Sequence, residues 1–321
     1  AAVSPARARE SSSAAPRFFS TCHNVSAMQN IKLTIAYDGA DFHGWQIQPG
    51  LATIQGTLAD AARKITQEKI FVYGASRTDA GVHSLGQVAH FKTHSNLTAD
   101  EFRRALNAVM PPQIRIMTEE EVGPDFHSRW QSLSKTYRYR IFRGRVLPPF
   151  EYRRILHYPW PLDEQAMAEG ARFFEGTHDF TSFAASSGSE EDDKDRDTMR
   201  EIYRSEIISH PYAAFGSNLA ASEQEGTPFE PGANEAPREI HYEVHGKSFL
   251  RYMVRKIVGT LLEIGKGKMK PADIPAILEM KDRSRSGPTV GPEGLYLVSL
   301  EYPDPTASLA HERRHVGREI G

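Results

Sequence analysis

The 321-residue chain has a single cysteine, Cys22, and no long run of apolar residues. One cysteine cannot form an intramolecular disulfide, which fits a reducing compartment, and it leaves no cysteine-based zinc site. Because a transmembrane helix needs about 20 consecutive apolar residues, no membrane span is predicted. A quarter of the residues are charged, as in a globular protein, and the length allows two hydrophobic cores.

Other absences exclude whole classes of chemistry. The glycines that precede Lys266 have the wrong spacing for a P-loop, and no Ser or Thr follows the lysine. No Gly-x-Gly-x-x-Gly run follows a predicted strand, so dinucleotide binding has no support. His241 and His245 would share one face of a strand, but no cysteine or carboxylate completes a metal set with them. The sequence therefore predicts neither a cofactor nor a metal site.

The net charge is −2, yet the charges are unevenly distributed along the chain. Eight Lys and Arg residues, Arg138 and Arg143 among them, lie between residues 129 and 154 against one acid, whereas residues 190–197 are mostly acidic. Because phosphate contacts depend on local charge, this basic run could bind RNA, and the interleaved Tyr137 offers a stacking surface. A strand with one solvated basic face and one buried aromatic face fits the alternation equally well.

Two alternating passes of strands and helices are predicted. Residues 31–37 alternate with period two, a helical stripe runs from Ile54 to Ile65, and Thr98-x-x-Glu101 is a capping box that opens a second helix. Strands at 71–74, 86–93 and 114–117 complete a βαββαβ order, which suggests a ferredoxin-like sheet.

The second pass begins with the strand around Tyr137. The sequence predicts helices at 163–175 and 249–265 and from Pro271, and strands at 202–209, 240–244 and 295–300. We therefore expect an α+β protein. It would contain two ferredoxin-like α/β halves whose mixed, largely antiparallel sheets lie side by side and form a central cleft.

The domain boundaries follow from composition. Residues 28–130 and 131–303 are predicted to form the two α/β domains, with a tail at 304–321. Segments 184–200 and 216–238 are rich in Ser, Gly, Pro and acids without apolar periodicity, which predicts loops. Residues 1–27 are predicted to be a disordered extension. Their Arg, Ser and Ala content resembles an organellar transit peptide, although Met28 could also begin a bacterial cytoplasmic protein.

One segment is not explained by packing alone, namely Gly-Ala-Ser-Arg-Thr-Asp-Ala-Gly-Val-His at 74–83. Arg77 and Asp79 stand two residues apart, directly after a strand-like run. Because residues i and i+2 of a strand face the same way, the two side chains could pair. A paired carboxylate stays ionised, as a nucleophile must. The alternative is an Asp in a tight turn with a surface ion pair.

This segment, continued through Phe91, resembles the active-site segment of the TruA family of tRNA pseudouridine synthases. Further motifs follow in the family's order, at 37–39, 42–46, 125–129, 135–139, 178–183, 253–259 and 293–297. The resemblance covers residues 28–303. One departure is Ser76, where the family usually has glycine, since a serine there needs a compatible φ.

The resemblance implies that uridine is isomerised to pseudouridine at positions 38, 39 and 40 of the tRNA anticodon stem-loop, by a homodimer without metal or cofactor. The uridine would be flipped into the cleft. Asp79 would be the nucleophile or base, with Arg77 and Arg255 as its cationic partners. Tyr137 would stack on the base and take the C5 proton. Leu297 would contact the uracil. Separately, the basic run predicts that Arg138 contacts the substrate.

The sequence leaves several alternatives open. Asp79 could add to the substrate covalently, or it could abstract a proton to give a glycal. Leu297 could be plain core. The protein could also be an RNA-binding module of the same fold without catalysis, or a pseudouridine synthase that acts on other RNA.

Overall fold

The computed structural model describes residues 27–185, 197–212 and 237–304. Most of the predicted extension and tail, Cys22 and the acidic run at 190–193 lie outside these residues. In the described part of the chain, no helix has the length and apolar content that crossing a membrane requires.

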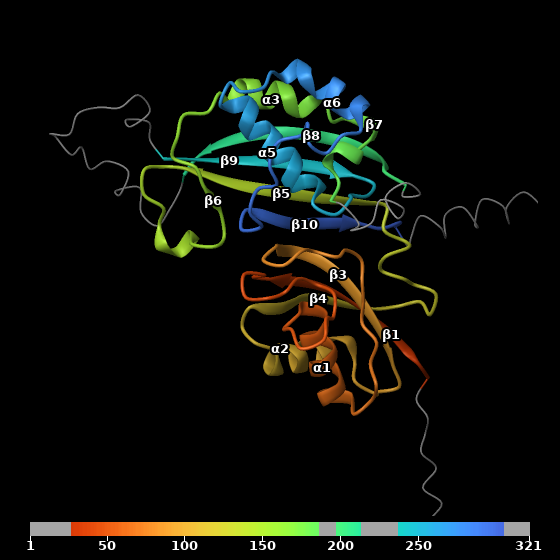
Figure 1. Cartoon of the computed structure of the whole chain (residues 1–321). Coiled ribbons are helices and arrows are strands. Elements are labelled where there is room, and N and C mark those ends of the chain that lie inside the picture. The colour runs from red at the N-terminus through yellow and green to blue at the C-terminus, as the bar shows by residue number, and fades with distance from the viewer. Residues whose placement is uncertain (1–26, 186–196, 213–236, 305–321) are drawn as a thin grey trace, which may run out of the picture.

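The first half follows the predicted βαββαβ order, and it consists of β1 (Gln29–Tyr37), α1 (Ile54–Thr66), β2 (Tyr73–Gly74), β3 (His83–Thr93), α2 (Ala99–Val109) and β4 (Ile114–Val122). Thr53 caps α1 by accepting a hydrogen bond from the backbone N–H of Gly56. The predicted capping box between Thr98 and Glu101 is present at the start of α2. Both helices cover the sheet of this half (Figure 1).

The second half consists of β5 (Ser134–Arg143), β6 (Leu156–His157), α3 (Glu164–Arg172), β7 (Gly176–Asp179), β8 (Met199–Pro211), β9 (Arg238–Gly246), α5 (Met253–Gly265), α6 (Ile274–Met280) and β10 (Leu295–Glu301). Short 3₁₀ helices lie at Pro149–Glu151, Thr181–Phe183 and Pro271–Asp273. Most of the predicted loops at 184–200 and 216–238 lies outside the described residues. Their last residues are strand, because β8 begins at Met199 and β9 at Arg238.

The strands of both halves form one ten-stranded sheet, in which eight strands follow the order β4-β1-β3-β10-β5-β9-β8-β7. The short strands β2 and β6 pair with β3 and β5 outside this order. Most neighbours are antiparallel, which confirms the mixed α+β class and the largely antiparallel sheet. The two sheets are continuous, however, and do not merely lie side by side. The last strand, β10, pairs in parallel with β3 and antiparallel with β5, so its backbone hydrogen bonds join the halves.

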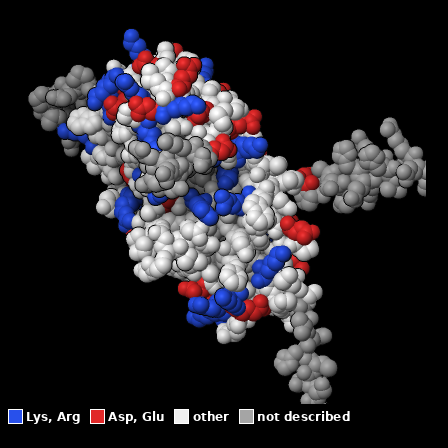
Figure 2. All heavy atoms as spheres, turned by 45° about the vertical axis from the view of Figure 1, so that its right-hand side comes forward, with Lys and Arg blue, Asp and Glu red and all other residues white. Residues whose placement is uncertain are grey.

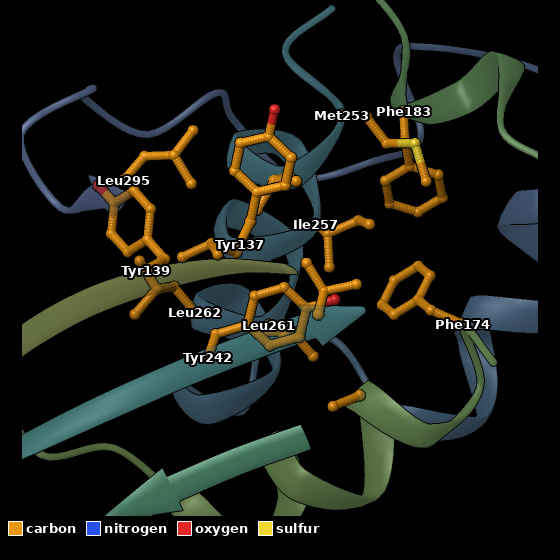
Figure 3. Close-up of a cluster of buried hydrophobic side chains, with 14 of the residues drawn as sticks. Tyr137, Tyr139, Phe174, Phe183, Tyr242, Met253, Ile257, Leu261, Leu262 and Leu295 are labelled. Atoms are coloured by element: carbon orange, nitrogen blue, oxygen red, sulfur yellow. The ribbon is translucent and has the colours of Figure 1, made fainter. Parts of the chain in front are cut away.

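Each half buries its own hydrophobic cluster. Ile31, Leu33 and Ile35 of β1 pack with α1 and α2 in the first. In the second, α5 packs against β5 and β9 (Figure 3). Val82 lies in the first half but packs into the second cluster. The segment around Val82 is therefore held at the junction of the two cores.

Candidate active site

The loop between β2 and β3, which carries Asp79, is held from several sides. The carbonyl of Thr78 accepts a 3.0 Å hydrogen bond from the backbone N–H of Trp45, and its hydroxyl lies 2.8 Å from the buried hydroxyl of Tyr37. Gly81 donates its N–H to the carbonyl of Phe42 at 3.2 Å. The predicted motifs at 37–39 and 42–46 thus act as supports for this loop.

Gly81 fixes the path of the loop after Asp79. Its φ is +78°, in the left-handed region that favours glycine. A Cβ atom at this position would stand 2.7 Å from the ring of Pro292, just before β10. Only glycine lets the loop approach the second half this closely.

Asp79 lines a cavity of about 700 Å³. The cavity is also lined by the rest of the loop between β2 and β3, by the start of β5 and by the segment before α5. Six of the described lining residues are cations, namely Arg77, Arg129, Lys135, Arg200, Arg251 and Arg255. Among the described lining residues, Asp79 is the one carboxylate. Lys and Arg side chains gather across the middle of the face that Figure 2 shows, whereas Asp and Glu lie mostly toward its edges. Such a cavity suits a polyanion.

Two arginines from the second half approach the Asp79 carboxylate, whose side chain is 20% exposed. Oδ2 lies 3.7 Å from Nη1 of Arg255, and Oδ1 lies 3.7 Å from Nε of Arg251. Burial raises the pKa of Asp79 above its ordinary value, while the charges of Arg255 and Arg251 oppose the rise. The two arginines therefore favour the ionised form of a desolvated carboxylate.

Tyr252 positions both arginines. The guanidinium carbons of Arg251 and Arg255 lie 4.8 and 4.9 Å from the centre of its ring, within the range of cation–π attraction. Its backbone is left-handed, with φ of 63°, and α5 begins directly after it. Arg255 is also fixed by a 2.7 Å hydrogen bond from Nε to the carbonyl of Val290. The helical stripe predicted from residue 249 gave no sign of this bend.

Replacing Tyr252 by Leu should lower kcat by about 5- to 30-fold, since each cation–π contact contributes about 0.5 to 1 kcal/mol. Both guanidinium groups would then lose the ring that holds them beside Asp79. The measurement is the single-turnover rate of the reaction that the family resemblance implies, pseudouridine formation on a tRNA transcript. Trp160→Leu removes an exposed aromatic side chain that lies outside this cavity, and it should leave the rate unchanged. Equal losses in both variants would contradict the positioning role.

Tyr137 lines the cavity from β5 and is buried. Its hydroxyl lies 2.8 Å from the Oγ of Ser76, and burial raises its pKa to about 12. Figure 3 shows it at the edge of the second core, with the hydroxyl pointing away from the rest of the cluster. Ser76 is not among the described residues with positive φ, so a serine fits where the resemblance suggested glycine.

The predicted pairing of Arg77 with Asp79 is not formed. Arg77 is exposed at the cavity, and the ion pairs of Asp79 in the described chain go to Arg251 and Arg255. The expectation assumed strand geometry, but β2 ends at Gly74. Residues 77–79 lie in a loop, where side chains two apart need not face the same way.

The alternation of β5 separates Arg138 from Tyr137. Arg138 lies on the opposite face of the strand and pairs with Glu243 of β9, with a 2.7 Å hydrogen bond from Nε. Arg143 is buried and bonds Glu164 at 2.7 Å. Neither arginine lines the cavity, so the cations there are not the ones that the strand pattern singled out.

Leu297 is fully buried in the second core. It does not line the cavity, whereas Leu295, two residues earlier on β10, does. Lys135 was not predicted as a site residue, although its position two residues before Tyr137 puts it on the same face of β5. Within the described ranges, no group of three His, Cys, Asp or Glu side chains could hold a metal ion.

Known proteins resemble the chain over most of its length. A family model described as tRNA pseudouridine synthase matches residues 33–131 and 171–303. The chain belongs to the tRNA pseudouridine synthase family. Asp79, Arg251 and Arg255 lie in the matched ranges of this synthase family, and Lys135 and Tyr137 lie between them.

Relatives named tRNA pseudouridine synthase A come from several bacteria. The protein of Solibacter usitatus is 42% identical over 275 residues, which cover 86% of this chain and all of that protein. That of Caldicellulosiruptor saccharolyticus is 40% identical over the same shares. That of Geobacillus kaustophilus is 39% identical, with 86% of this chain and 95% of that protein covered. These names place the chain in an isomerase family.

Proposed function

We propose that this protein isomerises uridine to pseudouridine at positions 38, 39 and 40 in the anticodon stem-loop of tRNA. The observation that carries the proposal is that Asp79 is the one carboxylate among the described residues that line the cavity, while the other charged residues described there are cations. The cavity volume of about 700 Å³ is in the usual range for small-molecule sites and suits one nucleotide. The relatives named tRNA pseudouridine synthase A support tRNA as the substrate.

The reaction breaks the bond between N1 and C1′ of uridine, turns the uracil and joins C5 to C1′. C5 then loses its proton and N1 gains one, so that the product is an isomer of uridine. Asp79 starts the reaction as nucleophile or base, and Arg251 and Arg255 favour its ionised form. Tyr137 lines the same cavity, and its hydroxyl can receive the C5 proton. Asp79 of the first half thus starts the cleavage of the glycosidic bond, and Tyr137 of the second half takes the proton from C5.

A uridine stacked in a stem must leave the helix to reach Asp79, at a cost of a few kcal/mol. Arg77, exposed at the cavity, is suited to fill the vacated stack. The surrounding cations would bind the flanking phosphates. Because the relatives are bacterial, we propose that the protein works in the cytoplasm. We also propose that it works as a homodimer, which sedimentation equilibrium can check.

The proposal is tested by incubating purified protein with a tRNA transcript and mapping pseudouridine by carbodiimide modification and primer extension. We expect stops at positions 38 to 40 when these are uridines and none when they are cytidines. Modification only elsewhere in the tRNA would contradict the assigned positions. Bound tRNA that is never modified would favour the RNA-binding module without catalysis.

Arg129→Ala should weaken tRNA binding and reduce the salt dependence of the affinity by about one unit, since one phosphate contact is lost. The measurement is the dissociation constant as a function of salt concentration. Arg138→Ala removes the same charge from β5 but outside the cavity, so its slope should stay unchanged. A loss confined to Arg138→Ala would instead place the RNA on the opposite face of the strand.

A further inference from the structure

The hydroxyl of Tyr137 is poorly suited to act as a base without help from another group. It is buried, and its pKa is raised to about 12, so the phenolate is scarce near neutral pH. If this hydroxyl receives the C5 proton, its own proton must leave at the same time. In the described structure, the hydrogen-bond partner of the hydroxyl is Ser76, at 2.8 Å.

Ser76 leads from Tyr137 to Lys135. The Oγ of Ser76 lies 3.5 Å from Nζ of Lys135, which also donates a 3.0 Å hydrogen bond to the carbonyl of Ala75. Gln87 holds the backbone of Ser76, because its side chain accepts from the Ser76 N–H at 3.1 Å and donates to the Ser76 carbonyl at 2.8 Å. The serine is therefore fixed, and its hydroxyl bridges the phenol and the amine.

Lys135 differs from Arg251 and Arg255, which pair with Asp79. In the part of the chain that the structure describes, no carboxylate lies within ion-pair distance of its Nζ. Burial and the charge of Arg129 lower its pKa to about 8. A substantial fraction of the amine is therefore neutral at mildly alkaline pH and can accept a proton.

The charged and titratable groups around Lys135 come from every neighbouring element. On the adjacent strands, Glu301 bonds Ser134 and lies 3.6 Å from His245, so it is engaged away from the amine. The charged and titratable groups that share the cavity with Lys135 are His43, Arg77, Asp79, Arg129, Tyr137, Arg200, Arg251, Tyr252 and Arg255. The excess of positive charge favours the neutral amine over the ammonium.

We propose that Ser76 and Lys135 form a proton relay that serves Tyr137 in the proposed pseudouridine synthesis, on which this inference rests. Tyr137 Oη receives the proton from C5 and gives its own to Ser76 Oγ, and Ser76 passes its proton to the neutral Nζ of Lys135. The electron pair of the broken C5–H bond restores the double bond between C5 and C6. The electron pair of the N1=C6 bond returns to N1, which takes a proton from water in the cavity. The Lys135 ammonium then releases its proton to water in the cavity.

The relay is tested with tRNA that carries tritium at C5 of its uridines, because tritium release reports the C5 step. The single-turnover rate of the wild-type protein should rise with pH between 6 and 9, with a midpoint near the pKa of Lys135. Lys135→Arg keeps the charge but cannot become neutral. We expect it to flatten the rise and to lower the rate at pH 9 by about 10- to 100-fold. Ser76→Ala should have the same effect.

Ser205→Ala is the matched control. The Oγ of Ser205 lies 2.9 Å from the hydroxyl of Tyr242, and both residues are fully buried in the second core away from the cavity. This variant loses the same kind of hydrogen bond and should keep the wild-type pH profile. A merely structural role for Ser76 would lower stability in both variants and would move neither profile.

The outcomes separate the relay from the proposed function. If the wild-type protein releases no tritium from any tRNA, the proposed function fails. If the wild-type protein releases tritium and Lys135→Arg and Ser76→Ala keep both its rate and its pH dependence, the relay fails. A loss of tRNA affinity in a Lys135→Gln variant with an unchanged rate at saturation would make Lys135 a phosphate contact and would also overturn the relay.

Discussion

Replacing Asp79 by Asn should abolish pseudouridine formation, with a loss of about 10⁴-fold or more in the single-turnover rate, while tRNA affinity stays within a few-fold of wild type. The amide has nearly the shape of the carboxylate but cannot attack the sugar or abstract a proton from it. Because Asp79 is the one carboxylate among the described lining residues, its loss makes the cavity more positive. Binding of the polyanion should therefore not fall.

The matched control is Asp60→Asn on α1, an exposed carboxylate that pairs with Arg63 on the same helix. Surface pairs of this kind contribute at most about 1 kcal/mol, so rate and affinity should both be unchanged. Turnover near the wild-type rate in Asp79→Asn would remove Asp79 from the chemistry. A large drop in affinity with turnover preserved at saturation would make it a binding residue.

The helices and strands that are determined by residues close together in the chain could be predicted from the sequence. The period-two alternation of 31–37 gave β1, and the Thr98 to Glu101 capping box gave the start of α2. Both patterns concern contacts within a few residues, which composition and spacing report directly. Asp79 was singled out by its glycine-bracketed loop and the family resemblance, and the structure places it in the cavity.

The partners of Asp79 could not be read from local spacing. Arg251 and Arg255 reach it from the start of α5, far along the chain. Arg77, the neighbour that spacing suggested, lines the same cavity but forms no ion pair with Asp79 in the described chain, since β2 ends before it. The bend at Tyr252 is a backbone conformation that non-glycine residues rarely adopt, so a helical pattern across it looked continuous.

The two faces of β5 show a second limit of prediction from the sequence. Alternation predicted that Tyr137 and Arg138 point to opposite sides, and they do. It could not say which face meets the cavity, because that depends on where α5 and β9 pack. Glu243 on β9 neutralises Arg138, whereas the cavity takes its cations from four separate segments of the chain.

A second large effect is expected from replacing Tyr137 by Phe. Tyr137→Phe should lower the rate of C5 proton release by about 10²- to 10⁴-fold, the usual range for a general base, while tRNA affinity stays unchanged. Phenylalanine keeps the ring that packs edge-on against Phe249, with centroids 5.0 Å apart, so the shape of the cavity is preserved. The hydroxyl that faces Ser76 is removed, and with it the acceptor for the C5 proton.

Tyr242→Phe provides the comparison for this change, because it deletes a buried hydroxyl that bonds Ser205 in the same core. Each variant removes one buried hydrogen bond between a tyrosine and a serine hydroxyl, which should cost about 1 kcal/mol of stability in both. The melting temperatures should therefore fall together while only Tyr137→Phe loses tritium release. Equal rates in the two variants would leave Tyr137 with a stacking role alone, and the C5 proton would then have to leave by way of another group in the cavity.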